Sequence, residues 1–438
     1  MKVLKFGGTS IGSAARIKNV AKLICDDGAQ KIVVLSAMSG TTNSLIEISD
    51  YFYKNNTSGA LEKINTLEQK YYVTTDELFS NDKYKSECTE IIKCHFDYIR
   101  AFSKSVFTLF EEKAILAQGE LLSTSMFQLY LHELGVNSAL LPALEYMRID
   151  KNAEPNTAYI AEHLIKQLEE HAGAEIYITQ GYICRNFYGE IDNLQRGGSD
   201  YTASLIGAAL NSEEIQIWTD IDGMHNNDPR FVEGTKPVAN LSFKEAAELA
   251  YFGAKILHPT CVLPAKLANI PVRLLNTMEP KAAGTTISAN SEKHTIKAVA
   301  AKDNITAIKI TSGRMLLAHG FLKKVFDIFD NYKTPVDMIT TSEVGISVTI
   351  DNDKFLSEIE TELKKYGNIK VYRDMVIVCV VGDLHYTNAG FQAKIVNALK
   401  DIPIYMISYG GSNCNVSFLV KAEDKKSALN ALSNKLFK

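Results

Sequence analysis

The sequence predicts an α/β protein with a mostly parallel sheet between layers of helices, followed by two smaller α+β modules. From the N-terminus to about residue 286, short apolar segments of strand length alternate with helical segments. This alternation is typical of a parallel sheet covered on both faces. Beyond that point the chain repeats itself, because a helix followed by two strand-like segments occurs at 321–350 and again at 391–420.

The composition is that of a globular protein with two or three domains. The chain has 438 residues, of which 46% are apolar and 22% charged, and this length exceeds one ordinary core. A net charge of −4 without a basic cluster argues against a nucleic-acid surface. Seven scattered cysteines without a C-x-x-C pair argue against disulfides and zinc. With no apolar run of membrane-spanning length and no secretory leader, we expect a cytoplasmic protein.

The first strand is indicated by Val3, Leu4 and Phe6, and a helix follows with its apolar positions at helical spacing. The strands expected in this part are 2–6, 31–36, 137–141, 175–179, 214–218 and 271–275. Long helices are expected at 84–110 and 112–134. The segments 280–286 and 288–293 break the periodicity and read as a linker. We therefore expect a catalytic domain at 1–296 and a regulatory region at 297–438.

The regulatory region can be built as two βαββαβ units, at about 304–373 and 374–438. In addition to the repeated segments, strands are expected near 304–311 and 369–382 and helices at 353–365 and 422–435. Strand exchange between the units is left open. This layout resembles paired ACT modules, which are small amino-acid-sensing domains. The alternative is a duplicated α+β domain that only dimerises.

The segment Lys5-Phe6-Gly7-Gly8-Thr9-Ser10 joins the first strand to the first helix. Two adjacent glycines expose backbone N–H groups, the helix start adds a positive dipole end, and Lys5 adds a full charge. This arrangement suits a nucleotide polyphosphate. It is neither a P-loop nor the dinucleotide G-x-G-x-x-G motif. The alternative is a simple tight turn.

A second glycine pair occurs in Arg196-Gly197-Gly198-Ser199-Asp200, ahead of a helix. Arg196 can bind a carboxylate through two hydrogen bonds. Asp200 could serve the chemistry, or it could be the helix N-cap, the commoner role of an aspartate there.

Two further segments carry charged and polar groups after predicted strands, where ligands gather in α/β sheets. The first, 218–230, contains Thr219, Asp220 and Arg230, and its spacing does not fit an EF-hand. The second, Phe252-Gly253-Ala254-Lys255-Ile256-Leu257-His258-Pro259, places Lys255 near a glycine. A solvated surface lysine is the alternative there.

These four motifs, in this order and followed by the ACT-like repeat, resemble the aspartate kinases of the amino acid kinase superfamily over essentially the whole chain. The resemblance implies the amino acid kinase fold and ATP-dependent phosphorylation of the β-carboxylate of L-aspartate. That reaction is the first step toward lysine, threonine and methionine. It also implies Mg²⁺ carried by ATP, without a direct protein ligand.

The resemblance also implies roles for individual residues. Lys5 and Asp200 would be catalytic, with Asp200 orienting Lys5 or a water on the metal. ATP would be bound by Lys5, Phe6, Gly7, Gly8, Thr219, Asp220, His225, Arg230 and Lys255. The aspartate pocket would contain Ser36, Thr42, Glu120, Arg196 and Ser199. Without the resemblance, Glu120 would read as an exposed helix residue.

A few positions depart from the family pattern. Gln195 and Tyr201 flank the second glycine motif where glycine and threonine are usual, His225 replaces an aromatic residue, and Leu121 replaces an arginine. These departures concern nucleotide preference and affinity more than the reaction class, because the charged residues that the chemistry needs are present.

The first ACT copy resembles the effector pocket of lysine-inhibited aspartate kinases. Its expected residues are Met315, Ala318, Gly320, Phe321, Leu322, Val336, Asp337, Ser342 and Glu343. Asp337 and Glu343 would provide acidic surroundings for a lysine ammonium, so lysine is the expected inhibitor and threonine the second choice. The second copy departs from the pattern at 410–413, which favours one effector site per chain. ACT pairs usually associate between chains, so a homodimer or homotetramer is expected.

Two other functions remain open from the residues. The chain could be another amino acid kinase, which the ACT pair, the motif at 196–200 and the motif at 252–259 disfavour. It could also be a catalytically inactive amino-acid sensor, which the presence of Lys5, Arg196 and Asp200 disfavours.

Overall fold

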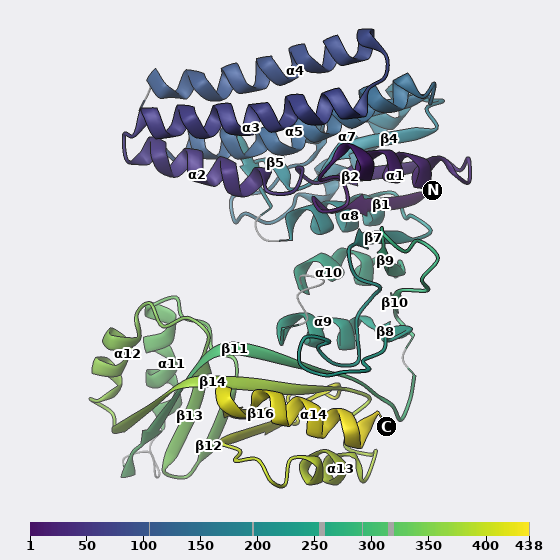
Figure 1. Cartoon of the computed structure of the whole chain (residues 1–438). Helices are drawn as coiled ribbons and strands as arrows, with labels where there is room; N and C mark the ends of the chain where they lie inside the picture. Colours follow the sequence, from purple (N-terminus) through teal and green to yellow (C-terminus); the bar gives the residue numbers. More distant parts are fainter. Residues whose placement is uncertain (105, 195–196, 254–258, 291, 314–318, 438) are drawn as a thin grey trace. The chain divides into compact units, whose positions relative to one another are not determined.

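The computed structural model describes residues 1–104, 106–194, 197–253, 259–290, 292–313 and 319–437 (Figure 1). The chain divides into two compact units. The first contains the described residues of 1–223 and 257–289, and the second those of 224–256 and 290–438.

The first unit is built on a sheet with the strand order β3-β4-β2-β1-β7-β9-β10. Neighbouring strands are parallel, except that β10 runs antiparallel to β9. The strands are β1 (Lys2–Phe6), β2 (Lys31–Leu35), β3 (Ser138–Leu141), β4 (Ile176–Gln180), β7 (Ile215–Thr219), β9 (Val272–Asn276) and β10 (Thr285–Ser288). All six expected strands are confirmed to within one residue at each end.

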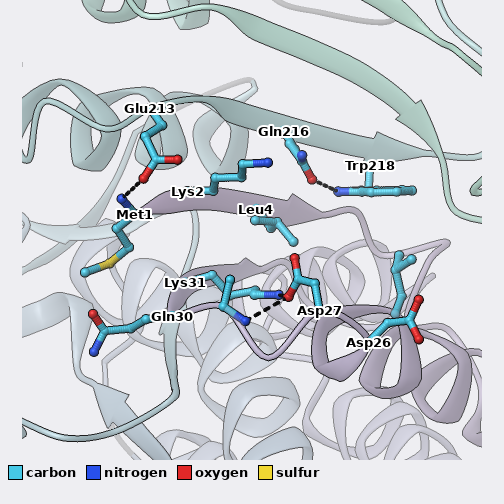
Figure 2. Close-up of a pocket in the computed structure, with 12 residues that line it drawn as sticks. Met1, Lys2, Leu4, Asp26, Asp27, Gln30, Lys31, Glu213, Gln216 and Trp218 are labelled. Carbon is cyan, nitrogen blue, oxygen red and sulfur yellow. Dashed lines mark hydrogen bonds and ion pairs between the residues drawn. The ribbon is translucent and has the colours of Figure 1, made fainter.

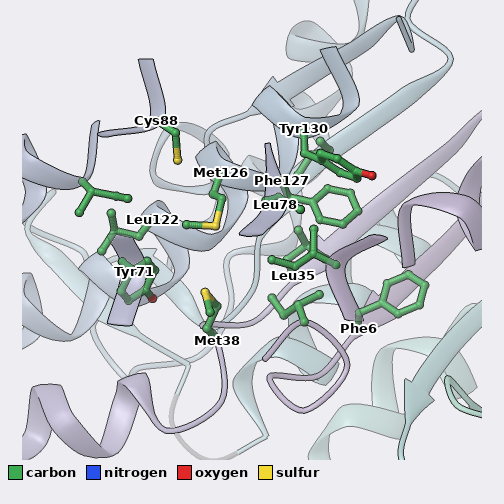
Figure 3. Close-up of a cluster of buried hydrophobic side chains, with 14 of the residues drawn as sticks. Phe6, Leu35, Met38, Tyr71, Leu78, Cys88, Leu122, Met126, Phe127 and Tyr130 are labelled. Atoms are coloured by element: carbon green, nitrogen blue, oxygen red, sulfur yellow. The ribbon is translucent and has the colours of Figure 1, made fainter. Parts of the chain in front are cut away.

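Helices flank this sheet, and a separate helical layer formed by α2 to α5 lies beside it (Figure 1). The helices are α1 (Ala14–Cys25), α2 (Thr41–Tyr53), α3 (Thr57–Leu78), α4 (Asp82–Ala101), α5 (Leu109–Glu133), α6 (Ala143–Tyr146), α7 (Thr157–Glu170), α8 (Gly198–Ala209) and α10 (Pro259–Leu267). A short hairpin is formed by β5 (Ile183–Arg185) and β6 (Ile191–Asn193). Figure 3 shows part of the buried apolar cluster of this unit, to which Phe6 and Leu35 of the strands and Tyr71, Leu122 and Phe127 of the helical layer belong.

The prediction of one helix over 84–110 is wrong at its C-terminal end. α4 ends at Ala101, a 3₁₀ turn covers Phe102–Lys104, and α5 already begins at Leu109. Thr108 caps α5, because its hydroxyl accepts a hydrogen bond from Phe110 N–H and the Glu111 carboxylate accepts one from Thr108 N–H. This capping box stabilises a new helix start and explains the break in a stretch without proline or glycine.

The second unit contains β8 (Asn240–Ser242), α9 (Phe243–Tyr251) and an antiparallel sheet with the order β12-β13-β11-β14-β16-β15. The strands are β11 (Ile296–Thr311), β12 (Ile339–Ser342), β13 (Gly345–Ile350), β14 (Asn368–Gly382), β15 (Met406–Tyr409) and β16 (Asn415–Lys421). The helices are α11 (Phe321–Asn331), α12 (Leu356–Leu363), α13 (Phe391–Ala398) and α14 (Lys425–Leu436).

β11 and β14 are long strands that both ACT-like modules share. Residues 306–311 of β11 pair with β13, whereas residues 375–381 of β14 pair with β16. The two long strands pair with each other from Ile296 to Thr311. β14 runs unbroken through residues 373 and 374, and β11 starts before residue 304. The sheet of the C-terminal module therefore includes the start of β11, and the sheet of the first module includes the start of β14.

Two separate apolar clusters fill this unit. One gathers α11 and α12 residues over β11 and β13, and the other gathers α13 and α14 residues over β14 and β16. Among the described helices of the whole chain, none is both long and apolar enough to cross a membrane.

Candidate active site

Several of the expected site residues lie at one edge of the first unit's sheet. Phe6 of β1 is in register with Leu35 of β2 and with Trp218 of β7, and Leu35 is in register with Gln180 of β4. The four parallel strands therefore end side by side. The segments that follow them, which begin at Gly7, Ser36, Gly181 and Asp220, leave from the same carboxyl edge, where ligands bind in such sheets.

The glycine turn after β1 is packed against the loop after β2. A Cβ added to Gly8 would lie 2.6 Å from the carbonyl oxygen of Ala37. The backbone N–H of Ser39 donates to Gly8 O at 3.1 Å. Only glycine fits this approach, because any side chain would push the two loops apart. The turn therefore holds the loops after β1 and β2 against each other.

Lys5 and Asp200 form an ion pair beside this turn. The distance from Lys5 Nζ to Asp200 Oδ1 is 2.6 Å, and both side chains are 13% exposed. Lys5 Nζ also lies 3.6 Å from the point where a Cβ on Gly7 would be. The N-cap of α8 is Gly197, with a φ of 75°, so Asp200 occupies the first turn and is not the cap. The N-cap interpretation of Asp200 is therefore wrong.

Two hydrogen bonds hold Ser199 and Glu120, both expected around aspartate, at the loop that begins with Ser36. The Ser36 hydroxyl donates to Ser199 Oγ at 3.0 Å, and Ala37 N–H donates to Glu120 Oε1 at 3.1 Å. Glu120 is buried rather than exposed, and burial raises the pKa of its carboxyl to about 8. Thr42 lies in the first turn of α2, which begins at the loop's end.

Two features at this edge had no part in the sequence prediction. Gly181 approaches Ser199 so closely that an added Cβ would lie 2.5 Å from Ser199 Cβ, and Tyr182 has a φ of +69°. The Lys70 ammonium of α3 donates to Ser39 O. The glycine two residues after the expected strand at 175–179 was a readable signal for the first feature. The sequence around Lys70 gave no such signal, because Lys70 and Ser39 are 31 residues apart and only the path of α3 brings them together.

Not every expected nucleotide residue contributes a side chain to this edge. The Phe6 ring is buried and stacks on Trp218, with a centroid distance of 5.8 Å. Only its backbone is available to a ligand. Thr219 ends β7, and its hydroxyl donates to Asp220 at 3.1 Å. Arg196 and Lys255, together with Gln195, lie outside the described residues.

His225 and Arg230 belong to the second unit. His225 Nδ1 shares a hydrogen bond with Thr235 Oγ1 at 2.9 Å. The Arg230 guanidinium donates more than one hydrogen bond to the Asp228 carboxylate, and the shortest, from Nη2 to Oδ2, is 2.6 Å. Burial alone would raise the pKa of the Asp228 carboxyl, but the Arg230 hydrogen bonds hold it below its usual value.

The expected effector residues lie around the start of α11 and the β12–β13 hairpin. Gly320 caps α11 with a φ of 77°, Phe321 is buried and Leu322 is exposed. The Asp337 carboxylate is buried and paired with Lys302 at 2.6 Å. The remaining expected residues are Val336, which packs against the module core, Ser342, whose hydroxyl is 3.5 Å from Gly345 O, and Glu343, which is exposed. Met315 and Ala318 lie outside the described residues.

A pocket of about 300 Å³ lies elsewhere in the first unit, near the amino ends of β1, β2 and β7 (Figure 2). It is lined by residues such as Lys2, Lys31 and Gln216. None of the expected site residues lines it. We therefore place the candidate site at the opposite, carboxyl edge, where the chemistry-bearing groups gather.

Comparison with known families agrees with this geometry. Residues 1–276 match the model of the amino acid kinase family, and residues 378–436 match an ACT domain. A relative named lysine-sensitive aspartokinase 3, from Escherichia coli, is 32% identical over 99% of this chain and 99% of its own length. The chain belongs to the aspartokinase family. The chloroplastic aspartokinase 3 of Arabidopsis thaliana is 33% identical over 99% of this chain and 81% of its own length.

Solved aspartokinases share the family fold along the whole chain. Aspartokinase III of E. coli in complex with aspartate and ADP matches with a TM-score of 0.86 and 31% identity, and both chains are fully covered. The same enzyme in complex with lysine and aspartate matches with a TM-score of 0.82. The aspartokinase of Clostridium acetobutylicum matches at 26% identity with a TM-score of 0.83.

Proposed function

We propose that the chain transfers the γ-phosphoryl group of ATP to the β-carboxylate of L-aspartate and so forms 4-phospho-L-aspartate. The observation that carries the proposal is the Lys5–Asp200 pair beside the Gly7–Gly8 turn, at the strand edge that also bears Ser36 and Glu120. The support from relatives is that solved E. coli aspartokinase III, similar over the full chain, binds aspartate and ADP.

The nucleophile needs no general base. An aspartate side chain has a pKa of about 3.9 and is ionised at neutral pH. The obstacle is repulsion between this anion and the phosphates. Catalysis therefore depends on positioning and on neutralising charge.

The described residues can supply both. Backbone N–H groups of the Gly7–Gly8 turn would hold phosphate oxygens, and the Lys5 ammonium would stabilise charge that develops on the transferred group. Asp200 would hold Lys5 in place or orient a water of Mg²⁺, since carboxylate oxygens suit that ion. Mg²⁺ would enter with ATP and neutralise phosphate charge.

The acceptor would be fixed by groups of opposite charge. Glu120, once ionised, would accept the α-ammonium of aspartate, and Ser36, Thr42 and Ser199 would add hydrogen bonds. Arg196 would bind the α-carboxylate, and Lys255, His225 and Arg230 would serve the nucleotide. These last roles rest on the family resemblance.

The proposal extends to regulation and cellular role. Residues 1–296 would form the catalytic domain and 297–438 the tandem ACT region, with lysine as feedback inhibitor and threonine as the second choice. The lysine-sensitive relative and the solved complex with lysine support this. We further propose a cytoplasmic homodimer or homotetramer that starts the pathway to lysine, threonine and methionine.

The test is ADP release by the purified chain with ATP and Mg²⁺, measured with L-aspartate, L-glutamate or no acceptor. Each reaction is repeated with millimolar lysine or threonine. Turnover that requires aspartate and falls with lysine is expected. Turnover with glutamate alone would indicate another amino acid kinase, and no turnover with any acceptor would indicate an inactive sensor.

A further inference from the structure

A cluster of four side chains in the second unit ties α9 to the predicted effector residues. Asp337 Oδ1 accepts hydrogen bonds from Tyr251 Oη and from Lys302 Nζ, both at 2.6 Å. Lys302 also pairs with Asp351 at 2.9 Å, and its ammonium lies 4.4 Å from the centroid of the Tyr251 ring. Tyr251 is the last residue of α9, so the end of this helix is bonded directly to Asp337.

The backbone that follows Tyr251 is held at the same place. Gly253 has a φ of +114°, and a Cβ added to it would lie 2.1 Å from the carbonyl oxygen of Ala301 in β11. The glycine turn is therefore packed directly on the strand that carries Lys302. Two residues further along the sequence is Lys255, which the family resemblance assigns to the nucleotide.

Asp337 has capacity for another cation. Its side chain is 1% exposed, and Oδ2 is buried without a hydrogen-bond partner among the described residues. A buried carboxylate oxygen without a partner is costly, so an ammonium that reached it would be bound with a charge-assisted hydrogen bond. That ammonium would share the carboxylate with Tyr251 and Lys302 and would change the strength of both bonds.

We propose that Tyr251 is a positioning residue that couples binding of a cationic amino acid at Asp337 to the placement of the Phe252–Gly253 turn ahead of Lys255. The proposal rests on the proposed function, because it concerns how the effector controls that reaction. A ligand changes activity only by its different affinity for two arrangements. The Tyr251 hydroxyl is the contact through which Asp337 favours one arrangement of the turn.

The experiment compares wild type with Tyr251→Phe, which removes the hydroxyl and keeps the ring over Lys302. Without lysine, kcat should stay within twofold of wild type. Lysine should still bind, with a Kd by calorimetry within threefold of wild type. Residual activity at saturating lysine should rise at least threefold. Tyr332→Phe is the matched control, because it removes a hydroxyl that donates at 2.9 Å to Glu362 of the same unit rather than to Asp337.

A second readout does not depend on turnover. In wild type, lysine should change hydrogen exchange of peptides that cover α9 and the turn at 252–253. In Tyr251→Phe this change should be lost, whereas Tyr332→Phe should retain it. If Tyr251→Phe lowers expression, Lys302→Met is measured in the same way, and a reduced exchange response is expected because Asp337 loses its other partner.

Unaltered lysine inhibition and exchange in Tyr251→Phe would overturn the coupling. Loss of lysine binding by more than tenfold would also overturn it, since Tyr251 would then bind the effector. Failure of the proposed function is distinguishable. A wild-type chain without aspartate-dependent turnover, but with the exchange change that Tyr251→Phe removes, would refute the kinase assignment and keep the coupling.

Discussion

Glu120 accepts a hydrogen bond from Ala37 N–H at 3.1 Å through Oε1, while its Oε2 is buried without a partner among the described residues. Burial raises the pKa of this carboxyl to about 8, and the backbone N–H offsets only part of that effect. The ligand-free protein therefore holds Glu120 mainly protonated at pH 7. A cationic group at Oε2 would favour ionisation.

The first prediction concerns the pH dependence of aspartate binding. If Glu120 must be ionised to accept the substrate ammonium, the ionised fraction rises about tenfold per pH unit below pH 8. The KM for aspartate should fall by about that factor between pH 6 and pH 7 and level off above pH 8, whereas kcat should change less. Steady-state kinetics at fixed ionic strength measure this. A KM independent of pH from 6 to 8 would remove Glu120 from substrate binding.

The second prediction concerns stability. The pKa of Glu120 is higher in the folded chain than its ordinary value of 4.5, so the folded state binds more protons between about pH 4.5 and pH 8. The contribution of Glu120 to the free energy of unfolding is then fully present below pH 4.5 and falls by about 1.4 kcal/mol per pH unit up to pH 8.

Glu120→Gln should remove this pH dependence and raise the thermal midpoint of the ligand-free protein at pH 8. The comparison is made by calorimetry at pH 5 and pH 8. Equal shifts of the midpoint at both pH values would show that Glu120 does not titrate in this range.

The third prediction concerns the ion pair at 2.6 Å between Lys5 and Asp200. Lys5→Ala removes the positive charge beside the glycine turn, and kcat should fall by about 100- to 1000-fold. The KM for aspartate should change far less. Lys2→Ala is the control, because Lys2 lies at the other end of the same strand. Wild-type turnover in Lys5→Ala would exclude Lys5 from the mechanism.

The fourth prediction concerns the approach of Gly8 to Ala37. In Gly8→Ala the new methyl group would lie 2.6 Å from Ala37 O and would force the two loops apart. We expect kcat/KM for ATP to fall more than about tenfold, since positioning of the phosphates is lost. Gly411→Ala provides the control, because a Cβ there meets nothing within 4 Å. If the two variants behaved alike, the close approach would have no role in nucleotide binding.

The fifth prediction concerns Lys70, whose ammonium donates to Ser39 O in the loop after β2. Partial burial of the ammonium lowers the pKa of Lys70. Lys70→Met keeps the stem but frees the loop, and the KM for aspartate should rise about three- to tenfold, the effect of losing one hydrogen bond worth about 1 kcal/mol. Lys63→Met, on the same helix, removes the ion-pair partner of Glu47 and should change the KM little.

The strands were predictable because each is a short apolar run between polar segments. The glycine turn at Gly7–Gly8 was equally readable, since its position between strand and helix is local information. The Lys5–Asp200 pair was not readable from local pattern, because 195 residues separate its partners. The family resemblance alone placed them together, and the structure gives their distance.

The two errors have different causes. The helix predicted over 84–110 ran too far because apolar residues continue past Ala101, whereas the start signal of the next helix, Thr108 with Glu111, was overlooked. The burial of Glu120 could not be read from its own helix, since α5 is buried on most of its surface and shows no polar face. Tertiary packing against the sheet decides its environment.

The shared strands β11 and β14 also have a consequence for how this chain can be made and diversified. The C-terminal module needs residues 296–302 of β11 at its edge, and these are synthesised more than 70 residues before β14 reaches its pairing segment. When the C-terminal module is synthesised, its edge strand, residues 296–302 of β11, is therefore already present. That strand segment stays unpaired until β14 has left the ribosome. A cut between the two modules would separate β11 from β14 and leave each module with an unpaired strand edge. Recombination that keeps the sheet intact therefore has to exchange both modules together.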